Sequence, residues 1–137
     1  MHILYPAFAL MALTMFCMIR LAFLRLAAVR SGEIDPRFFR LFRGYDEPDK
    51  LAAYSRHIVN LFEAPLLFYV IILTAYVTRQ SEPWLIGLAW AYVALRFVHT
   101  YVHLTSNVVI VRFRIFALSM LTLIVLWASA LTNIMRS

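Results

Sequence analysis

Residues 115–135, IFALSMLTLIVLWASALTNIM, form an uninterrupted run of 21 uncharged residues. A helix needs about 20 predominantly apolar residues to cross a bilayer, so this run predicts a membrane span. Residues 3–19 form a second uncharged run, and apolar stretches near 57–78 and 84–104 bring the count to four. The sequence therefore predicts an all-α membrane protein built as a bundle of four transmembrane helices.

The composition supports one membrane domain over residues 1–137. Hydrophobic residues make up 64% of the chain and the mean hydropathy is +0.79, whereas roughly 45–50% of residues are apolar in a soluble domain. The single cysteine, Cys17, excludes a disulfide framework and a cysteine metal cluster. The expected elements are spans at about 3–29, 48–78, 84–104 and 112–135, and a short amphipathic helix at about 35–43.

Basic residues concentrate around two of the three connections between spans, and the chain carries a net charge of +6. They are Arg25, Arg30, Arg37, Arg40, Arg43, Lys50 and Arg56 around the first connection, and Arg112 and Arg114 at the third. The positive-inside rule places these connections in the cytoplasm and both termini outside it. Because the basic residues lie at a membrane face, we expect membrane lipid, and not nucleic acid, as a partner.

Two of the predicted spans carry ionisable and polar side chains within apolar sequence. They are Arg56, Asn60 and Glu63 in one span, and Arg96, His99 and His103 in the other. Helical spacing places each set along one face of its helix. A charge at bilayer depth costs several kcal/mol, so such residues normally face a partner, a water-filled cavity or a ligand. We therefore predict a polar, ligand-binding site between membrane helices.

Depth in the membrane predicts which of these groups meet. At about 1.5 Å per residue, Glu63 and Arg96 both lie roughly 10 Å below the same membrane face. We predict that they form an ion pair, within one subunit or between two, and such a pair would serve structure as readily as function. Arg30, Arg112 and Arg114 lie at the adjoining helix ends, and the part of this cluster within the membrane contains no second carboxylate. This surplus of positive charge favours an anionic ligand.

Two other kinds of ligand fit parts of the pattern. A basic pocket at a cytoplasmic face also binds anionic lipid headgroups. His99 and His103, at positions i and i+4, present two imidazoles on one face, and Glu63 or His57 would complete a metal site. The neighbouring arginines repel a cation and compete for the carboxylate, so we assign no residue to a metal.

Both polar motifs resemble those of a known family. Residues 56–65, RHIVNLFEAP, resemble the Arg-x-x-x-Asn-x-x-Glu signature of the MAPEG family, the membrane-associated proteins of eicosanoid and glutathione metabolism. Residues 96–105, RFVHTYVHLT, followed by Arg112, resemble the family's helix-three signature and the basic residue that opens helix four. The two motifs occur in the family's order in a chain with four predicted spans.

The resemblance implies a homotrimer that binds glutathione between neighbouring subunits, near the cytoplasmic face. The glutathione-binding residues predicted on this basis are Arg30, Arg56, Asn60, Glu63, Arg96 and His99. The counterpart of Arg112 lies near the glutathione sulfur in transferases and synthases of the family. A neighbouring guanidinium stabilises a thiolate, so Arg112 is a predicted catalytic residue, with Arg114 as its competitor for that place.

Two departures from the family pattern bear on activity. His103 occupies a position that often carries tyrosine, and we predict that it acts as an acid or base or forms a hydrogen bond to the second span. Ala64 stands where some synthases have tyrosine, so we do not expect eicosanoid synthesis. The chain resembles a bacterial-type branch, which implies the bacterial inner membrane.

The activity implied by the resemblance is that of a glutathione transferase or peroxidase acting on lipophilic electrophiles or hydroperoxides. One alternative is a non-catalytic membrane module that binds anionic lipid or a partner membrane protein. The other is a histidine-centred metal site.

Overall fold

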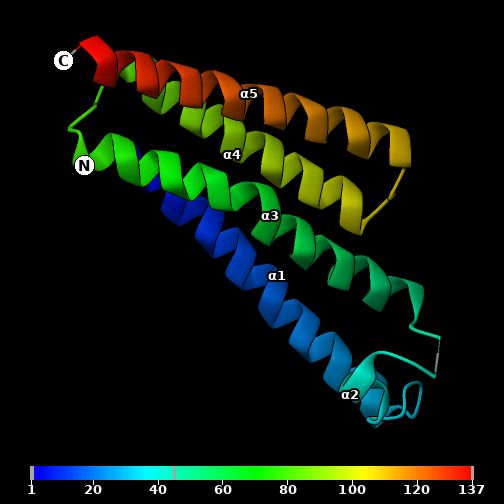
Figure 1. The fold of residues 1–137 in the computed structure, drawn as a ribbon. Helices are drawn as coiled ribbons and strands as arrows, with labels where there is room; N and C mark the ends of the chain where they lie inside the picture. Colours follow the sequence, from blue (N-terminus) through cyan, green and yellow to red (C-terminus); the bar gives the residue numbers. More distant parts are fainter. Residues whose placement is uncertain (1, 45, 137) are drawn as a thin grey trace.

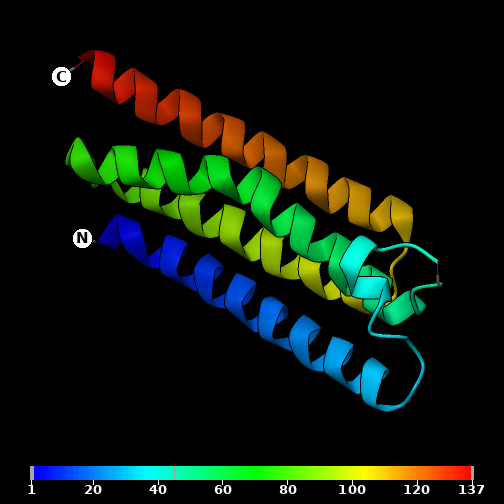
Figure 2. The same ribbon diagram turned by 60° about the horizontal axis from the view of Figure 1, so that its bottom comes forward.

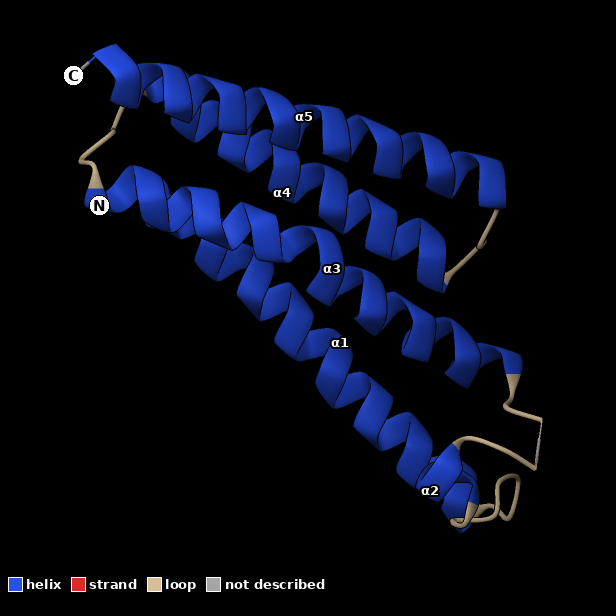
Figure 3. Cartoon of the chain, in the orientation of Figure 1, coloured by secondary structure: helices blue, strands red, loops and turns tan. Residues whose placement is uncertain are grey.

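The computed structural model describes residues 2–44 and 46–136, which fold almost entirely into helices (Figure 3). The elements are η1 (His2–Leu4), α1 (Tyr5–Arg30), α2 (Phe38–Leu41), α3 (Asp49–Val77), α4 (Pro83–Leu104) and α5 (Val109–Arg136). Among the described residues, four helices are long and apolar enough to cross a membrane: α1 together with η1, α3, α4 and α5. The predicted all-α fold with four membrane helices is therefore confirmed.

The four long helices form an up-and-down bundle (Figure 1). The N-terminus, the C-terminus and the α3–α4 turn lie at one end, and the α1–α3 connection and the α4–α5 turn lie at the other. We call the latter the α2 end, formed by residues 31–44, 46–48 and 105–108. The predicted basic connections lie at this end.

Helices α3 and α4 form the middle of the bundle (Figure 2). Each of them packs against α1 and against α5, whereas α1 and α5 do not touch each other within the described chain. The buried core between the helices is apolar and includes Leu10, Leu61, Phe68, Tyr92 and Leu126. The rings of Phe68 and Tyr92 stack with centroids 4.6 Å apart. Many large apolar side chains on the outer faces are exposed, as lipid or a neighbouring subunit requires.

The short helix α2 closes the α2 end with an amphipathic turn. The Asp35 carboxylate accepts a hydrogen bond from the backbone N–H of Arg37 at 2.7 Å, which stabilises the turn that leads into α2. Phe38 is buried against the ends of α1 and α3, while Arg37 is exposed. The helix ends at Leu41 because Phe42 adopts the left-handed conformation, with φ of 52°. Phe38 thus holds α2 against the bundle, while Arg40 and Leu41 are exposed.

Candidate functional site

The structure divides the predicted site residues into a buried set and an exposed set. The three residues on α4 face the bundle interior: Arg96, His99 and His103 are 0%, 2% and 1% exposed. On α3, by contrast, Arg56 and Glu63 are exposed. Within one chain, the motif on α4 therefore faces the interior, whereas Arg56 and Glu63 of the motif on α3 face away from it.

The predicted ion pair between Glu63 and Arg96 does not form within the described chain, because Glu63 lies on the outer side of α3. Arg96 Nη2 donates to the backbone carbonyl of Asn60 at 3.0 Å. Its guanidinium carbon also lies over the Phe116 ring, 5.7 Å from the centroid. An ion pair between Glu63 of one subunit and Arg96 of another remains a prediction. The complete burial of Arg96 within its own chain argues against it.

His57 takes the place opposite α4 that the motif pattern suggested for its neighbour Arg56. It is fully buried and lies beside His99 and His103. The ring centroids are 4.9 Å apart for His57 and His103, 5.8 Å for His57 and His99, and 5.7 Å for His99 and His103. We call these three residues the histidine cluster. The sequence signal for His57 was its helical register with Leu61, four residues later on the buried face.

A threonine links the histidine cluster to the α4 backbone. Thr100 Oγ1 donates to the carbonyl oxygen of Arg96 at 2.8 Å and lies 2.9 Å from Nε2 of His57. Both Thr100 and His57 are buried, so this contact lies inside the bundle. Neither residue was among the predicted binding residues. The register of Thr100, four residues after Arg96, indicates the same face of α4.

Arg112 on the first turn of α5 contacts the histidine cluster from the side. Its Nη1 donates to Asn107 Oδ1 at 2.8 Å and to His103 Nε2 at 3.2 Å. Arg112 is half-buried, whereas Arg114 is exposed. Of the two candidate arginines, Arg112 is the one that contacts the buried polar groups. His103 thus contacts α5, and the predicted hydrogen bond from His103 to the second span is not seen among the described residues.

A small surface pocket opens over these groups between α3, α4 and α5. Its volume is about 200 Å³ and its lining consists of Asn60, His99, Val109, Arg112, Phe113 and Phe116. We call it the α3–α5 pocket. A guanidinium, an imidazole and an amide meet in it without a carboxylate in the lining, so its chemistry favours an anion.

The other predicted residues lie outside this pocket. Arg30 is exposed at the C-terminal end of α1, and Arg56 and Glu63 are exposed on α3. Arg96 and His103 lie behind the pocket wall, Arg96 against Phe116 and His103 against Arg112. One chain therefore brings three of the predicted residues, Asn60, His99 and Arg112, into a common lining.

The described residues offer no arrangement for a metal ion. No group of three or more His, Cys, Asp or Glu side chains within residues 2–44 and 46–136 is placed to hold one. The histidine cluster also contacts Arg112, a positive charge that opposes a bound cation.

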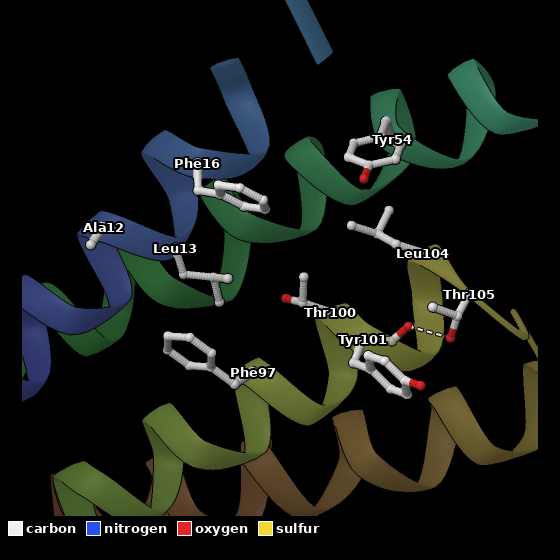
Figure 4. Close-up of a pocket in the computed structure, with 9 residues that line it drawn as sticks. All are labelled: Ala12, Leu13, Phe16, Tyr54, Phe97, Thr100, Tyr101, Leu104 and Thr105. Carbon is white, nitrogen blue, oxygen red and sulfur yellow. Dashed lines mark hydrogen bonds between the residues drawn. The ribbon is translucent and has the colours of Figure 1, made fainter. Parts of the chain in front are cut away.

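A second, larger hollow lies on the other side of α4, between α1, α3 and α4 (Figure 4). Its volume is about 570 Å³, and most of its lining is apolar or aromatic, including Leu13, Phe16, Phe97 and Leu104. Leu13 of α1 and Phe97 of α4 point toward one another across it (Figure 4). Thr100, which contacts His57, also lines this hollow, whereas its neighbour His99 lines the α3–α5 pocket, so α4 contributes to both hollows.

Comparison with known proteins identifies one family. The family model described as "MAPEG family" matches residues 3–132, a range that includes α1, α3 and α4, α5 as far as residue 132, and every residue of the α3–α5 pocket. Comparison with curated proteins gave no match, and comparison with solved structures gave none either.

Proposed function

This chain belongs to the MAPEG family and is an integral membrane protein, and from that premise we propose that it binds glutathione and activates the glutathione thiol. The observation that carries the proposal is the joint lining of the α3–α5 pocket by Asn60, His99 and Arg112. Glutathione brings two carboxylates and a thiol, which suit a lining of hydrogen-bond donors with surplus positive charge.

Arg112 is the residue proposed to hold the sulfur as a thiolate. A free thiol has a pKa of about 8.5, so most of it is protonated at neutral pH. A guanidinium beside the sulfur favours the thiolate, which is the nucleophile. His99 lines the same pocket, and its imidazole is the group proposed to accept the thiol proton. His103, behind Arg112, is proposed to position that guanidinium through the 3.2 Å contact.

The proposed reaction is the attack of the thiolate on a lipophilic electrophile or a hydroperoxide. In the transferase reaction, the sulfur forms a bond to an electrophilic carbon while the leaving group departs with the bonding electron pair. Val109 and Phe113 line the pocket and are 67% and 63% exposed on the outer face of α5. A substrate dissolved in the lipid can reach the sulfur over these two side chains.

A homotrimer is proposed as the complete binding unit. The α3–α5 pocket holds about 200 Å³, less than the roughly 300–1,000 Å³ usual for a small-molecule site. Arg56 and Glu63 are exposed on α3, and Arg30 is exposed at the end of α1. A neighbouring subunit that covers these groups would enlarge the site and supply the remaining predicted glutathione contacts.

Orientation and location follow from the charge distribution. The α2 end carries the basic connections, and we propose that it lies in the cytoplasm with both termini outside. The proposed location is a bacterial inner membrane. The expected partners there are membrane lipid and the other subunits, and not nucleic acid.

Calorimetry tests the binding step directly. Glutathione titrated into the purified protein in detergent should bind saturably, and Asn60→Ala or His99→Ala should weaken binding because each removes a group from the pocket lining. Arg114→Ala is the matched control, since this exposed arginine lies outside the lining and should leave binding unchanged. Absence of any heat of binding from the wild-type protein would refute the proposal.

The apolar hollow in Figure 4 favours one alternative, a non-catalytic module that binds lipid. Its volume of about 570 Å³ and its apolar lining suit an acyl chain. This alternative predicts that phospholipid copurifies with the protein in an amount that Arg112→Ala does not change, measured by mass spectrometry. It also predicts that glutathione does not bind.

A further inference from the structure

The interior of the bundle contains polar atoms that the fold leaves without hydrogen bonds. Within the described residues, Nδ1 of His57, His99 and His103 are all buried and have no hydrogen-bond partner. Buried polar atoms are nearly always paired, because leaving one unpaired costs about 1–3 kcal/mol. Three such atoms in one cluster therefore call for a specific arrangement of the ring protons.

The contact with Thr100 determines where His57 carries its proton. The Thr100 hydroxyl has one hydrogen, which it donates to the Arg96 carbonyl at 2.8 Å. At its 2.9 Å contact with His57 the hydroxyl must then accept, so His57 Nε2 carries a hydrogen and donates it. In the neutral ring, Nδ1 of His57 is left as an acceptor.

The contact with Arg112 determines the opposite arrangement in His103. A guanidinium can only donate hydrogen bonds, so His103 Nε2, 3.2 Å from Arg112 Nη1, accepts one. The neutral His103 ring must then carry its hydrogen on Nδ1. The two unpaired Nδ1 atoms of His57 and His103 are thus an acceptor and a donor on rings whose centroids lie 4.9 Å apart.

We propose that one water molecule links the two rings, accepting a hydrogen bond from His103 Nδ1–H and donating one to His57 Nδ1, because the two atoms form no direct hydrogen bond. This link completes a chain from the Arg96 carbonyl on α4, through Thr100, His57 and His103, to Arg112 on α5. His57 is then a positioning residue. It holds His103 in the form whose Nε2 can accept from Arg112.

Loss of His57 has a defined consequence. The Nδ1–H of His103 then has no acceptor, so the Nε2–H form, which gives up the contact with Arg112 Nη1, becomes populated beside the Nδ1–H form. Arg112 then keeps Asn107 as its remaining side-chain partner among the described residues. The proton positions follow from the contacts alone, whereas any effect on glutathione rests on the function proposed above.

Nitrogen NMR of the full-length protein tests the proton positions without glutathione. The chain has four histidines, and single substitutions assign the ring-nitrogen signals of a sample labelled with ¹⁵N-histidine. Near neutral pH, we expect the hydrogen on Nε2 of His57 and on Nδ1 of His103. A hydrogen on Nε2 of His103, or on Nδ1 of His57, would overturn the proposal.

Three variants test the coupling between the rings. His57→Phe fills the space without a donor or acceptor, and His103 should then populate both tautomers. His57→Gln can donate to Thr100 and accept from the linking water, so it should restore the Nδ1–H form. Thr100→Val removes the acceptor for His57 Nε2–H, so His57 should then populate both tautomers. This variant tests the hydrogen-bond chain independently of whether His57→Phe folds. A single Nδ1–H form of His103 in His57→Phe would contradict the coupling.

The functional consequence has a separate measurement. If glutathione binds as proposed, the thiolate fraction of bound glutathione should fall about tenfold in His57→Phe, the effect of roughly one lost hydrogen bond. His57→Gln should recover most of it. An unchanged thiolate signal in His57→Phe would refute the positioning role. Absence of glutathione binding in the wild type would instead refute the proposed function and leave the NMR result valid.

Discussion

Replacement of Arg96 by methionine is expected to leave the protein as stable as before, or more stable. Arg96 is fully buried, donates one hydrogen bond to the Asn60 carbonyl at 3.0 Å and lies over the Phe116 ring. A hydrogen bond to a charged group is worth about 1.5–3 kcal/mol, and a cation–π contact about 0.5–2 kcal/mol. These gains amount to about 2–5 kcal/mol.

The cost of burying the guanidinium offsets these gains. An ion withdrawn from water loses several kcal/mol of solvation, and Nε and Nη1 of Arg96 have no hydrogen-bond partner within the described chain. Methionine removes the charge and fills similar space. Apolar replacement of buried ionic groups is often neutral or stabilising by about 1–4 kcal/mol, which is the range expected here.

Reversible unfolding of the protein in detergent, followed by circular dichroism, measures this effect. Glu63→Gln is the companion variant, because it removes the carboxylate of the ion pair predicted between subunits. We expect no loss of stability in either variant. A loss of about 3–5 kcal/mol in both, the usual cost of breaking a buried pair, would refute the reasoning and restore that ion pair.

Three further predictions concern a contact beside the site, a contact at the far end of the bundle, and the proposed trimer. Asn107→Gly should preserve the fold, because glycine readily adopts the φ of 49° found at Asn107. It should weaken glutathione binding, measured by calorimetry, because Arg112 loses the Asn107 Oδ1 acceptor at 2.8 Å. Equal affinity in the variant and the wild type would contradict this role of Asn107. Gln80→Ala should lower the free energy of unfolding by about 1–3 kcal/mol, because buried Gln80 donates a hydrogen bond to the Ala130 carbonyl at 3.1 Å. An unchanged unfolding curve would show that this hydrogen bond does not hold the α3–α4 turn to α5. Native mass spectrometry should find three copies per particle, and a monomer that still binds glutathione would exclude the trimer as the binding unit.

The fold was predictable from the sequence because its signal is long and unambiguous. The runs at 3–19 and 115–135 contain no charged residue, whereas a soluble helix of the same length normally carries charged residues on its outer face. The basic residues are concentrated at two of the three connections between spans. The helical bundle then follows from the need to satisfy every backbone polar group within the membrane.

The orientation of each helix in the bundle was less predictable. In a membrane protein the outer faces of the helices are apolar too, so hydrophobic periodicity does not say which face turns inward. On α3, Arg56 and His57 are neighbours, and the motif drew attention to Arg56, whereas packing buries His57. The same rotation exposes Glu63 and separates it from Arg96.

The choice between Arg112 and Arg114 depended on one turn of the backbone. Asn107 adopts the left-handed conformation, and its N–H donates to the Val102 carbonyl at 2.8 Å, which ends α4. That turn sets where α5 begins and directs Arg112, not Arg114, to the histidine cluster. A shift of two residues in the start of α5 would exchange them, and the sequence pattern alone contains no signal that fixes this start.

We propose that Arg112 holds glutathione as a thiolate in the α3–α5 pocket. Ultraviolet difference absorbance of the thiolate, recorded while glutathione is titrated into the purified protein near neutral pH, tests it most directly. We expect a saturable thiolate signal in the wild type and in Arg114→Ala, and its loss in Arg112→Ala. A wild type without this signal, or an Arg112→Ala variant that retains it in full, would contradict the claim.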